Sequence, residues 1–528
     1  MPHVSNVRLR ALALIAMVVT ASLAALLLPG AASAASRADC LDRKNGTYQQ
    51  LLACITIDGV RAHQAAFQEI AENNDDPIYP GTRAAGTEGY DESAEYVADL
   101  MEDAGYEVTI DEFDFTFQFP VILRQITPTQ GSYFANPAVG TGFGNVTANV
   151  VAVDINLVPP RANTSGCEAA DFAAFPAGSI ALMQRGTCPF ATKAFNAQAA
   201  GASAVVLFNQ GDTAANDRNN ALNPTLNPPP AALIPVVGTS FADGALLAQP
   251  GSTAQVSVTP AETRESVNVI AELEGDNDDN VVMAGAHLDS ETLGPGINDN
   301  GSGSAALIET ALMMQNLTPT NTIRFAWWGA EESGLVGSTA YVAQLSAAER
   351  ADIALYMNYD MIGSPNYFLG VYDADRSTFA ATGVTIPNGS TAIEDVYEAY
   401  YTKVGEPYDD SEFSGRSDYQ AFINANIPSG GLFTGAEVEK TAAQQAIWGG
   451  TAGQQFDPCY HIACDTYDNV NLDALEVNSD LVAFAQLTFA YSTQSVNGEP
   501  GTTVPGSAGF KVPTTPAGPE GTFPDQTP

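Results

Sequence analysis

The sequence has few positive charges. Of its 528 residues, 20 are lysine or arginine and 61 are aspartate or glutamate, which gives a formal net charge of −41 at pH 7. A chain with such an excess of acid does not attract nucleic acid or an anionic membrane surface over long range. We interpret most of the acidic residues as a solvated exterior, because they outnumber what any binding site could use.

Histidine is also scarce, with four residues in the whole chain. His3 lies in the N-terminal apolar segment, and His63 lies in an amphipathic polar stretch that predicts a surface position. His287 and His461 instead stand beside acidic residues or cysteines at predicted loop positions. Histidines in that setting are candidates for metal binding or catalysis.

Long apolar runs are missing everywhere except at the N-terminus. There, Arg8 and Arg10 precede an apolar run from Ala11 to Leu28 and then the small-residue stretch AASAAS. This order is typical of a secretory signal peptide, so we predict a signal over 1–34, cleaved near Ala34, and a secreted protein. Cleavage would remove two arginines and no acid, changing the net charge from −41 to −43. A retained membrane anchor is the alternative, because the run approaches the ~20 residues that span a bilayer.

The six cysteines all lie beyond the predicted signal. An even number in an exported chain predicts disulfides, and we expect pairing between cysteines that are close in sequence. The predicted pairs are Cys40 with Cys54, Cys167 with Cys188, and Cys459 with Cys464. The last pair brackets His461 as Cys-x-His-x-x-Cys, which could hold a structural zinc instead.

The texture of the sequence changes twice along the chain. Helical spacing over 60–75 and 92–108 gives way, from about residue 130, to small residues, prolines and short strand-like pieces. A strand pattern resumes near residue 266, and strands then alternate with helices, which is typical of an α/β fold with a mainly parallel sheet. We therefore predict one domain over 35–129 and 259–495, a second unit inserted over 130–258, and a disordered tail over 496–528.

Three apolar strands of the second half end in polar side chains. NVVMAGAHLDS ends in His287 and Asp289, IRFAWWGAEES in Glu331 and Glu332, and IALYMNYDMIG in Asp360. The carboxyl ends of parallel strands form the ligand-binding edge of a sheet, so these side chains are expected to converge.

Two further candidates lie in loops. Asp299 lies in the glycine-rich segment GPGINDNGSGSAA, and His461 lies in PCYHIACDT. Imidazole and carboxylate ligands suit Zn²⁺, and this many anionic groups exceed what one tetrahedral ion takes. Two ions that share a carboxylate would use them all, and Asp299 is the natural bridge.

The motifs AGAHLDS, GPGINDNGSGSAALIE, WWGAEESGLVGS, MNYDMIG, SGRSDYQAF, GGLFTGAE and PCYHIACDT occur in that order. Together they resemble the motif series of secreted two-zinc aminopeptidases of family M28. The resemblance covers roughly 60–125 and 265–495 and implies the zinc exopeptidase fold, a mixed, mainly parallel sheet with helices on both faces. The inserted segment, with GSIALMQRGTCPFATKAFNAQAAGASAVVLFN, resembles a protease-associated (PA) domain of β/α type.

Carried over to this sequence, the resemblance implies a role for each candidate residue. The expected metal set is His287 and Asp360 on one zinc, Glu332 and His461 on the other, and Asp299 on both. Glu331 would be the general base that activates a water between the ions, and Tyr460 would donate a hydrogen bond to the developing oxyanion. Asp289 would orient the His287 imidazole, and Arg416 and Phe433 would line the substrate site. A core position for Phe433 is the alternative.

The function expected is removal of N-terminal residues, with a preference for apolar ones, from peptides or proteins. A metallocarboxypeptidase on the same scaffold would need a basic pocket for the substrate carboxylate, and the sequence shows no such cluster of Lys and Arg. A binding protein that has lost catalysis would lack a ligand or the base, and none is missing. We expect a monomer without a nucleic-acid partner, and without membrane attachment after signal cleavage. The sequence leaves open the role of the PA unit and any additional Ca²⁺.

Overall fold

The computed structural model describes residues 36–211, 218–226, 232–380 and 383–507. The predicted signal peptide lies outside this range, as does the predicted tail from residue 508 onward. Among the helices of the described residues, none combines the length and the apolar character needed to cross a bilayer.

The first sheet carries the strands that were expected to end in polar side chains. Its order is β1 (Glu107–Phe117), β10 (Glu262–Leu273), β12 (Asn321–Trp328), β11 (Asn277–His287), β13 (Ile353–Tyr359), β16 (Ser429–Phe433), β14 (Gly370–Tyr372) and β15 (Asp409–Ser411). From β12 through β11 and β13 to β16 all neighbours are parallel, whereas β1–β10, β10–β12 and β14–β16 are antiparallel. The prediction of a mixed, mainly parallel sheet is confirmed.

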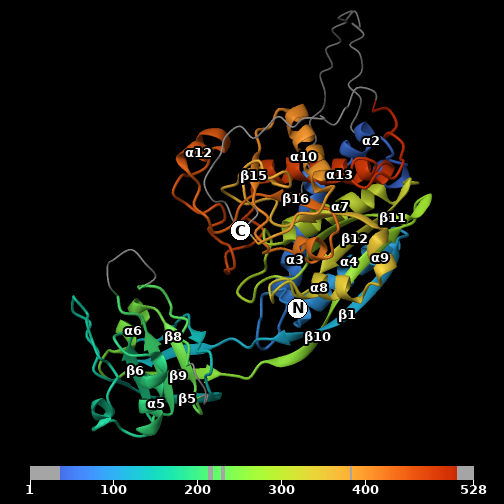
Figure 1. The fold of residues 1–528 in the computed structure, drawn as a ribbon. Coiled ribbons are helices and arrows are strands. Elements are labelled where there is room, and N and C mark those ends of the chain that lie inside the picture. Colours follow the sequence, from blue (N-terminus) through green and yellow to red (C-terminus); the bar gives the residue numbers. More distant parts are fainter. Residues whose placement is uncertain (1–35, 212–217, 227–231, 381–382, 508–528) are drawn as a thin grey trace, which may run out of the picture.

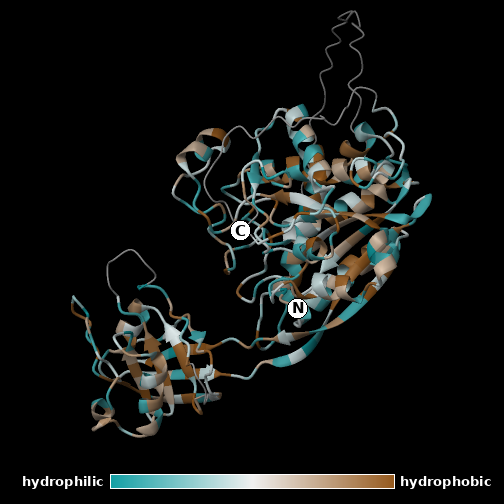
Figure 2. Ribbon diagram, in the orientation of Figure 1, coloured by the Kyte–Doolittle hydropathy of each residue, from teal (hydrophilic) through white to brown (hydrophobic). Residues whose placement is uncertain are grey.

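Helices cover both faces of this sheet (Figure 1). One face carries α4 (Glu88–Asp103), α7 (Gly301–Met314) and α13 (Leu472–Tyr491), with α3 (Ile57–Asn73) packed on α7 and α10 (Ser390–Val404) beside α13. The other carries α8 (Val336–Gln344), α9 (Ala347–Asp352) and α11 (Tyr419–Asn424). The remaining helices of this part are α1 (Arg37–Asp42), α2 (Tyr48–Leu52) and α12 (Ala442–Trp448). Figure 2 shows hydrophobic residues concentrated in the central strands between these layers.

His63 corrects one expectation, because it is buried rather than on the surface. It is 4 % exposed in α3, where its Nδ1 lies 2.7 Å from the Tyr96 hydroxyl and its Nε2 lies 3.4 Å from Glu309 Oε2. Glu309 comes from α7, whose residues are all buried, and it also pairs with Arg37. A polar residue is buried here because it contacts the buried carboxylate of Glu309. The sequence of α3 alone gives no sign of this partner.

A second sheet lies between β1 and β10 in the chain. Its order is β3 (Gly131–Ser132), β2 (Ile122–Thr127), β9 (Thr253–Val258), β5 (Gly144–Ala152), β6 (Ile180–Gln184), β7 (Ala204–Phe208), β8 (Val236–Thr239) and β4 (Asn136–Pro137). It is accompanied by α5 (Phe190–Ala199), α6 (Phe241–Leu247) and the 3₁₀ turn η1 (Ala169–Phe172). The completely buried strands β6 and β7 alternate their side chains between two small cores, one on each face.

The way the chain enters and leaves this second sheet is simple. Strands β1 and β10 pair antiparallel over the whole of β1, from Glu107 opposite Glu272 to Phe117 opposite Glu262. The chain therefore departs at the end of one strand and returns at the start of its neighbour, and the second sheet forms a separate lobe (Figure 1). The domain boundaries at 130 and 258 stay a prediction.

All six cysteines are paired in the structure, as Cys40–Cys54, Cys167–Cys188 and Cys459–Cys464. The third bridge closes the short loop that carries Tyr460 and His461. Its sulfurs are therefore not available to a separate structural zinc.

Candidate active site

The site is built where three adjacent strands of the first sheet end. Strand β11 ends at His287, β12 continues through a short turn to Glu331 and Glu332, and β13 is followed at once by Asp360. Because these strands are parallel neighbours, their carboxyl ends meet at one edge of the sheet. Ala330 and Met361 adopt left-handed backbone conformations there, with φ of 53° and 54°, which turn the chain away from the sheet. Such conformations concentrate at functional sites.

Five predicted residues form two groups that share Asp299. On one side, His287 Nε2 lies 3.2 Å from Asp299 Oδ1 and 3.3 Å from Asp360 Oδ1. On the other, His461 Nε2 lies 3.1 Å from Asp299 Oδ2 and 3.2 Å from Glu332 Oε2. Each oxygen of Asp299 therefore faces a different histidine.

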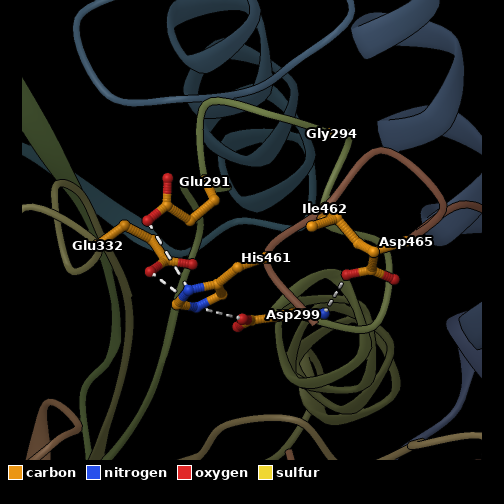
Figure 3. A pocket seen from close by; sticks show the side chains of 8 residues that line it. Glu291, Gly294, Asp299, Glu332, His461, Ile462 and Asp465 are labelled. Carbon is orange, nitrogen blue, oxygen red and sulfur yellow. Dashed lines mark hydrogen bonds and ion pairs between the residues drawn. The ribbon is translucent and has the colours of Figure 1, made fainter. Parts of the chain in front are cut away.

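The loop that carries Asp299 is held by a residue that sequence reasoning missed. Asp465 accepts hydrogen bonds from the backbone N–H groups of Asn298, at 2.8 Å, and Asp299, at 2.9 Å. Figure 3 shows Asp299 on one side of the His461 imidazole and Glu332 on the other, with the Asp465 carboxylate next to the Asp299 backbone nitrogen. Glu291, which was also missed, lies 3.8 Å from His461 Nδ1. The only sequence signal for Asp465 is its place in the PCYHIACDT motif.

Asp289 connects two of the strand ends. Its carboxylate accepts hydrogen bonds from the backbone N–H groups of Glu331, at 3.1 Å, and Glu332, at 3.3 Å. Its backbone carbonyl lies 3.0 Å from His287 Nδ1, whereas its carboxylate lies 3.6 Å away. A hydrogen bond from Nδ1 leaves the lone pair of Nε2 directed at Asp299 and Asp360, as a metal ligand requires.

Two carboxylate oxygens of the site have no hydrogen-bond donor among the described residues. They are Glu332 Oε1 and Asp360 Oδ1, and both are buried. The other Asp360 oxygen accepts a 2.6 Å hydrogen bond from the Ser417 hydroxyl, a contact that the sequence did not suggest. Buried oxygens without donors are rare, and their presence beside two imidazoles points to a cation.

The pKa values show how strongly the cluster demands positive charge. Burial disfavours a charged His461, but its contacts with Asp299 and Glu332 outweigh burial and raise its pKa to about 11. Burial and repulsion from Asp299 raise the pKa of Glu332 to about 8. Burial also opposes the ionised form of Asp299, yet the two imidazoles hold its pKa well below the usual range. Without a metal, protons neutralise the cluster, and a divalent cation would displace them. Imidazole nitrogens with carboxylate oxygens fit zinc.

The cluster forms the floor of a cleft of about 380 Å³. Glu331, which is 8 % exposed, and Tyr460, whose ring stacks on His461 at 3.6 Å between centroids, line it. Arg416 forms part of the rim and contacts Glu437 at 2.9 Å and the Tyr460 hydroxyl at 3.3 Å. Phe433 is buried and also lines the cleft, so the core and substrate-site interpretations of this residue both apply.

Comparison with known proteins agrees with this geometry. Residues 268–486 match the model of peptidase family M28, and residues 146–247 match the PA domain. An aminopeptidase of Pseudomonas aeruginosa is 45 % identical over 84 % of this chain and 83 % of its own length. The probable lipoprotein aminopeptidase LpqL of Mycobacterium tuberculosis is 40 % identical over 84 % of this chain and 87 % of its own length.

Solved structures give the same result. BSAP, a zinc aminopeptidase from Bacillus subtilis, is 25 % identical with a TM-score of 0.55, over 81 % of this chain and 94 % of its own. An aminopeptidase from Aneurinibacillus sp. strain AM-1 is 26 % identical with a TM-score of 0.52, over 83 % of this chain and 95 % of its own. The donor set, the cleft and these likenesses agree: the chain belongs to peptidase family M28 and is a zinc-dependent aminopeptidase with a PA domain.

Proposed function

We propose that this aminopeptidase holds two zinc ions, with Asp299 as the shared ligand. His287 and Asp360 would complete one set, and Glu332 and His461 the other. The observation that carries this proposal is the position of Asp299 between the two histidines. Its two carboxylate oxygens lie 3.2 Å and 3.1 Å from different imidazole nitrogens. Zinc ions bound there would act as Lewis acids on water and on the scissile carbonyl group.

Glu331 acts as the general base in this proposal. It lines the cleft beside the two groups, and it belongs to neither of them. Its carboxylate takes a proton from the attacking water and passes that proton to the nitrogen of the leaving amine. Asp289 holds the backbone at both glutamates, because its carboxylate accepts hydrogen bonds from the N–H groups of Glu331 and Glu332. A fixed backbone would keep the two side chains in separate roles, one as the base and the other as a zinc ligand.

Tyr460 and Arg416 act on the other side of the reacting carbonyl. The Tyr460 hydroxyl donates a hydrogen bond to the oxygen on which negative charge develops, which stabilises the transition state. The Arg416 contact at 3.3 Å keeps that hydroxyl at the cleft, and the Cys459–Cys464 bridge fixes the backbone around it.

The substrate that suits this cleft is a free peptide N-terminus. Its ammonium group is attracted by the surrounding carboxylates, and Leu335, Met361 and Phe433 offer apolar contact to the first side chain. A carboxypeptidase would need a cation for the substrate carboxylate. Among the described residues that line the cleft, Arg416 is the only Lys or Arg, and Glu437 already binds it.

We further propose that the protein is secreted and acts as a monomer, with the PA domain inserted over 130–258. The three disulfides support an oxidising compartment. The signal peptide itself lies outside the described residues. A non-catalytic binding role is the less favoured alternative, because every expected ligand and the base are present.

The test is hydrolysis of leucyl-arylamide by the purified protein, with N-acetyl-leucyl-arylamide as the blocked control. We expect turnover of the free amine alone, loss of turnover after chelation, and recovery as zinc content returns to two per chain. Activity that resists the chelator, or equal hydrolysis of the blocked substrate, would refute the proposal.

A further inference from the structure

A second cluster of carboxylates lies away from the cleft, at the far edge of the first sheet. Glu394 and Glu398 are one turn apart in α10, and Asp410 lies in β15. One carboxylate oxygen from each lies within 4.8 Å of the others. All three residues are buried, with exposed fractions of 2 %, 4 % and 1 %. Glu394 also belongs to an adjoining group with Asp373 and Asp375.

Two oxygens of this cluster lack a donor among the described residues. They are Glu398 Oε2 and Asp410 Oδ1, and both are completely buried. The other oxygen of Asp410 is satisfied, because the hydroxyls of Ser377 and Thr378 donate to it. These donors hold the Asp410 carboxylate in place through Oδ2 and leave Oδ1 buried without a donor beside the glutamates.

The charges around these groups make the lack of donors more costly. Glutamates four residues apart on a helix repel each other even at a surface. Burial, followed by repulsion from Asp375, Glu398 and Asp410, raises the pKa of Glu394 to about 10. Burial, followed by repulsion from Asp410 and Asp395, raises the pKa of Glu398 to about 8. The cluster therefore needs either protons or a cation at neutral pH.

We propose that Glu394, Glu398 and Asp410 bind one Ca²⁺ ion. All the proposed ligand atoms are carboxylate oxygens, which a hard cation such as Ca²⁺ prefers. The cluster differs in this from the zinc site, whose two imidazoles suit a borderline ion. Calcium binds oxygens at about 2.3–2.6 Å, so it joins oxygens up to roughly 5 Å apart, whereas Mg²⁺ at about 2.0–2.1 Å demands a tighter shell. The three carboxylate oxygens lie within 4.8 Å of one another, so one calcium ion can contact all of them. Asp375, at the exposed side of the cluster, provides a further carboxylate.

The position of this site indicates what the ion would do. It would join α10 to β15, a short edge strand that pairs with β14 alone in the sheet order. The chain leaves β15 at Ser411 and soon reaches Arg416, at the cleft rim, and Ser417, which binds Asp360. Bound calcium would thus stabilise the fold and the loop that forms one wall of the cleft.

The experiment uses the whole zinc-loaded protein after removal of calcium and dialysis into zinc-replete, calcium-free buffer. We expect equilibrium binding of radioactive Ca²⁺ to give one ion per chain. We also expect a rise in Tm of at least about 3 °C when Ca²⁺ is in hundredfold excess over its dissociation constant. Mg²⁺ at the same concentration should give less than half of that rise. E398Q and D410N should each abolish both responses, whereas the exposed control E69Q should keep them.

The alternative, carboxyl groups held neutral by protons, predicts different results. The wild type would then bind no calcium above background and show the same Tm with and without it, which overturns the proposal. Calcium binding that persists in both E398Q and D410N overturns the assignment to this cluster. The isotope measurement on the wild type decides the first point even if a variant fails to fold. Zinc content and arylamide turnover are recorded separately, so failure of the zinc proposal is distinguishable.

Discussion

The two carboxylate clusters on the first sheet differ in donor chemistry and in access. The cluster at the ends of β11, β12 and β13 includes two histidines and opens into a cleft, whereas the cluster between α10 and β15 contains oxygens alone and is buried. Imidazole favours a borderline ion such as zinc, and an all-oxygen set favours calcium. The open cleft would let substrate reach an ion held by the first cluster, whereas an ion held by the buried second cluster would serve stability.

The clusters also differ in how their acids ionise. The pKa of Asp299 is held well below the usual range, since its contacts with two imidazoles outweigh burial. The pKa of Glu394 is raised to about 10, because burial and other carboxylates act on it together. Imidazoles contact Asp299, whereas the groups that shift the pKa of Glu394 are other acids. In both clusters a metal ion has to displace protons, from His461 and Glu332 in the cleft and from Glu394 and Glu398 at the second cluster, so the metal affinity of each should fall as the pH falls.

The largest expected effect comes from D299N, which removes the charge shared by both groups of the cleft. We expect zinc content to fall below one ion per chain and turnover of leucyl-arylamide to fall to the zinc-free level. E398Q, the matched change at the second cluster, should retain its zinc. Metal analysis of both dialysed variants checks this, and a D299N protein with two firmly bound zincs would break the comparison.

The next largest effect is expected for E331Q, which removes the base and leaves the proposed ligands in place. Loss of general-base catalysis should lower kcat by roughly 10²–10⁴-fold. Zinc content and KM should change little, because Glu331 binds no metal in our proposal. Steady-state kinetics with metal analysis measure both quantities. Unchanged kcat would exclude Glu331 as the base, and a loss of zinc would make it a ligand.

A smaller effect is expected for D465N, because Asp465 acts through the backbone of Asn298 and Asp299. An amide replaces one of the two accepting oxygens, so the Asp299 loop should lose part of its support. Residues that position metal ligands typically contribute 10–100-fold to metal affinity, and we expect a loss in that range. Competition with a zinc chelator measures it, with D468N, an exposed acid of the same loop, as control. Equal zinc affinity in both variants would limit Asp465 to a structural role.

The convergence of the candidate zinc ligands could be predicted because apolar strands stop abruptly at polar residues. His287, Glu332 and Asp360 each follow such a run, and parallel strands bring their ends together without further information. The disulfide pairing could be predicted as well, because cysteines that are close in sequence are also close in space. Asp465 and Ser417 could not be found in this way, because they act on a backbone N–H or on a ligand that is far away in the chain.

Charged residues on helices were harder to interpret for a related reason. His63 was expected at the surface, but its partner Glu309 comes from a buried helix 246 positions further along the chain. Glu394 and Glu398 likewise have the spacing of a solvated helix face. Their burial and the approach of Asp410 depend on how β15 packs at the sheet edge, which no local pattern encodes.

The smallest expected effect is a change in substrate preference in F433L. Phe433 lines the cleft and packs edge-on against Phe368, with 6.1 Å between ring centroids. Leucine keeps most of the apolar volume, so folding should survive, whereas alanine would leave a cavity costing about 3–5 kcal/mol. A change of one or a few methylene groups in an apolar pocket alters an enzyme's discrimination between substrate side chains by roughly tenfold. We expect the ratio of kcat/KM for leucyl-arylamide over alanyl-arylamide to change by up to that factor, with zinc content unchanged.

The matched control for F433L is F175L, an aromatic residue of the PA lobe that packs against Phe172. It tests whether loss of any ring contact alters the preference through general loosening of the fold. The ratio of the two substrates should stay at the wild-type value in F175L and shift in F433L alone. An equal ratio in all three proteins would show that Phe433 serves only the core, and the side-chain preference would then have to come from Leu335 and Met361.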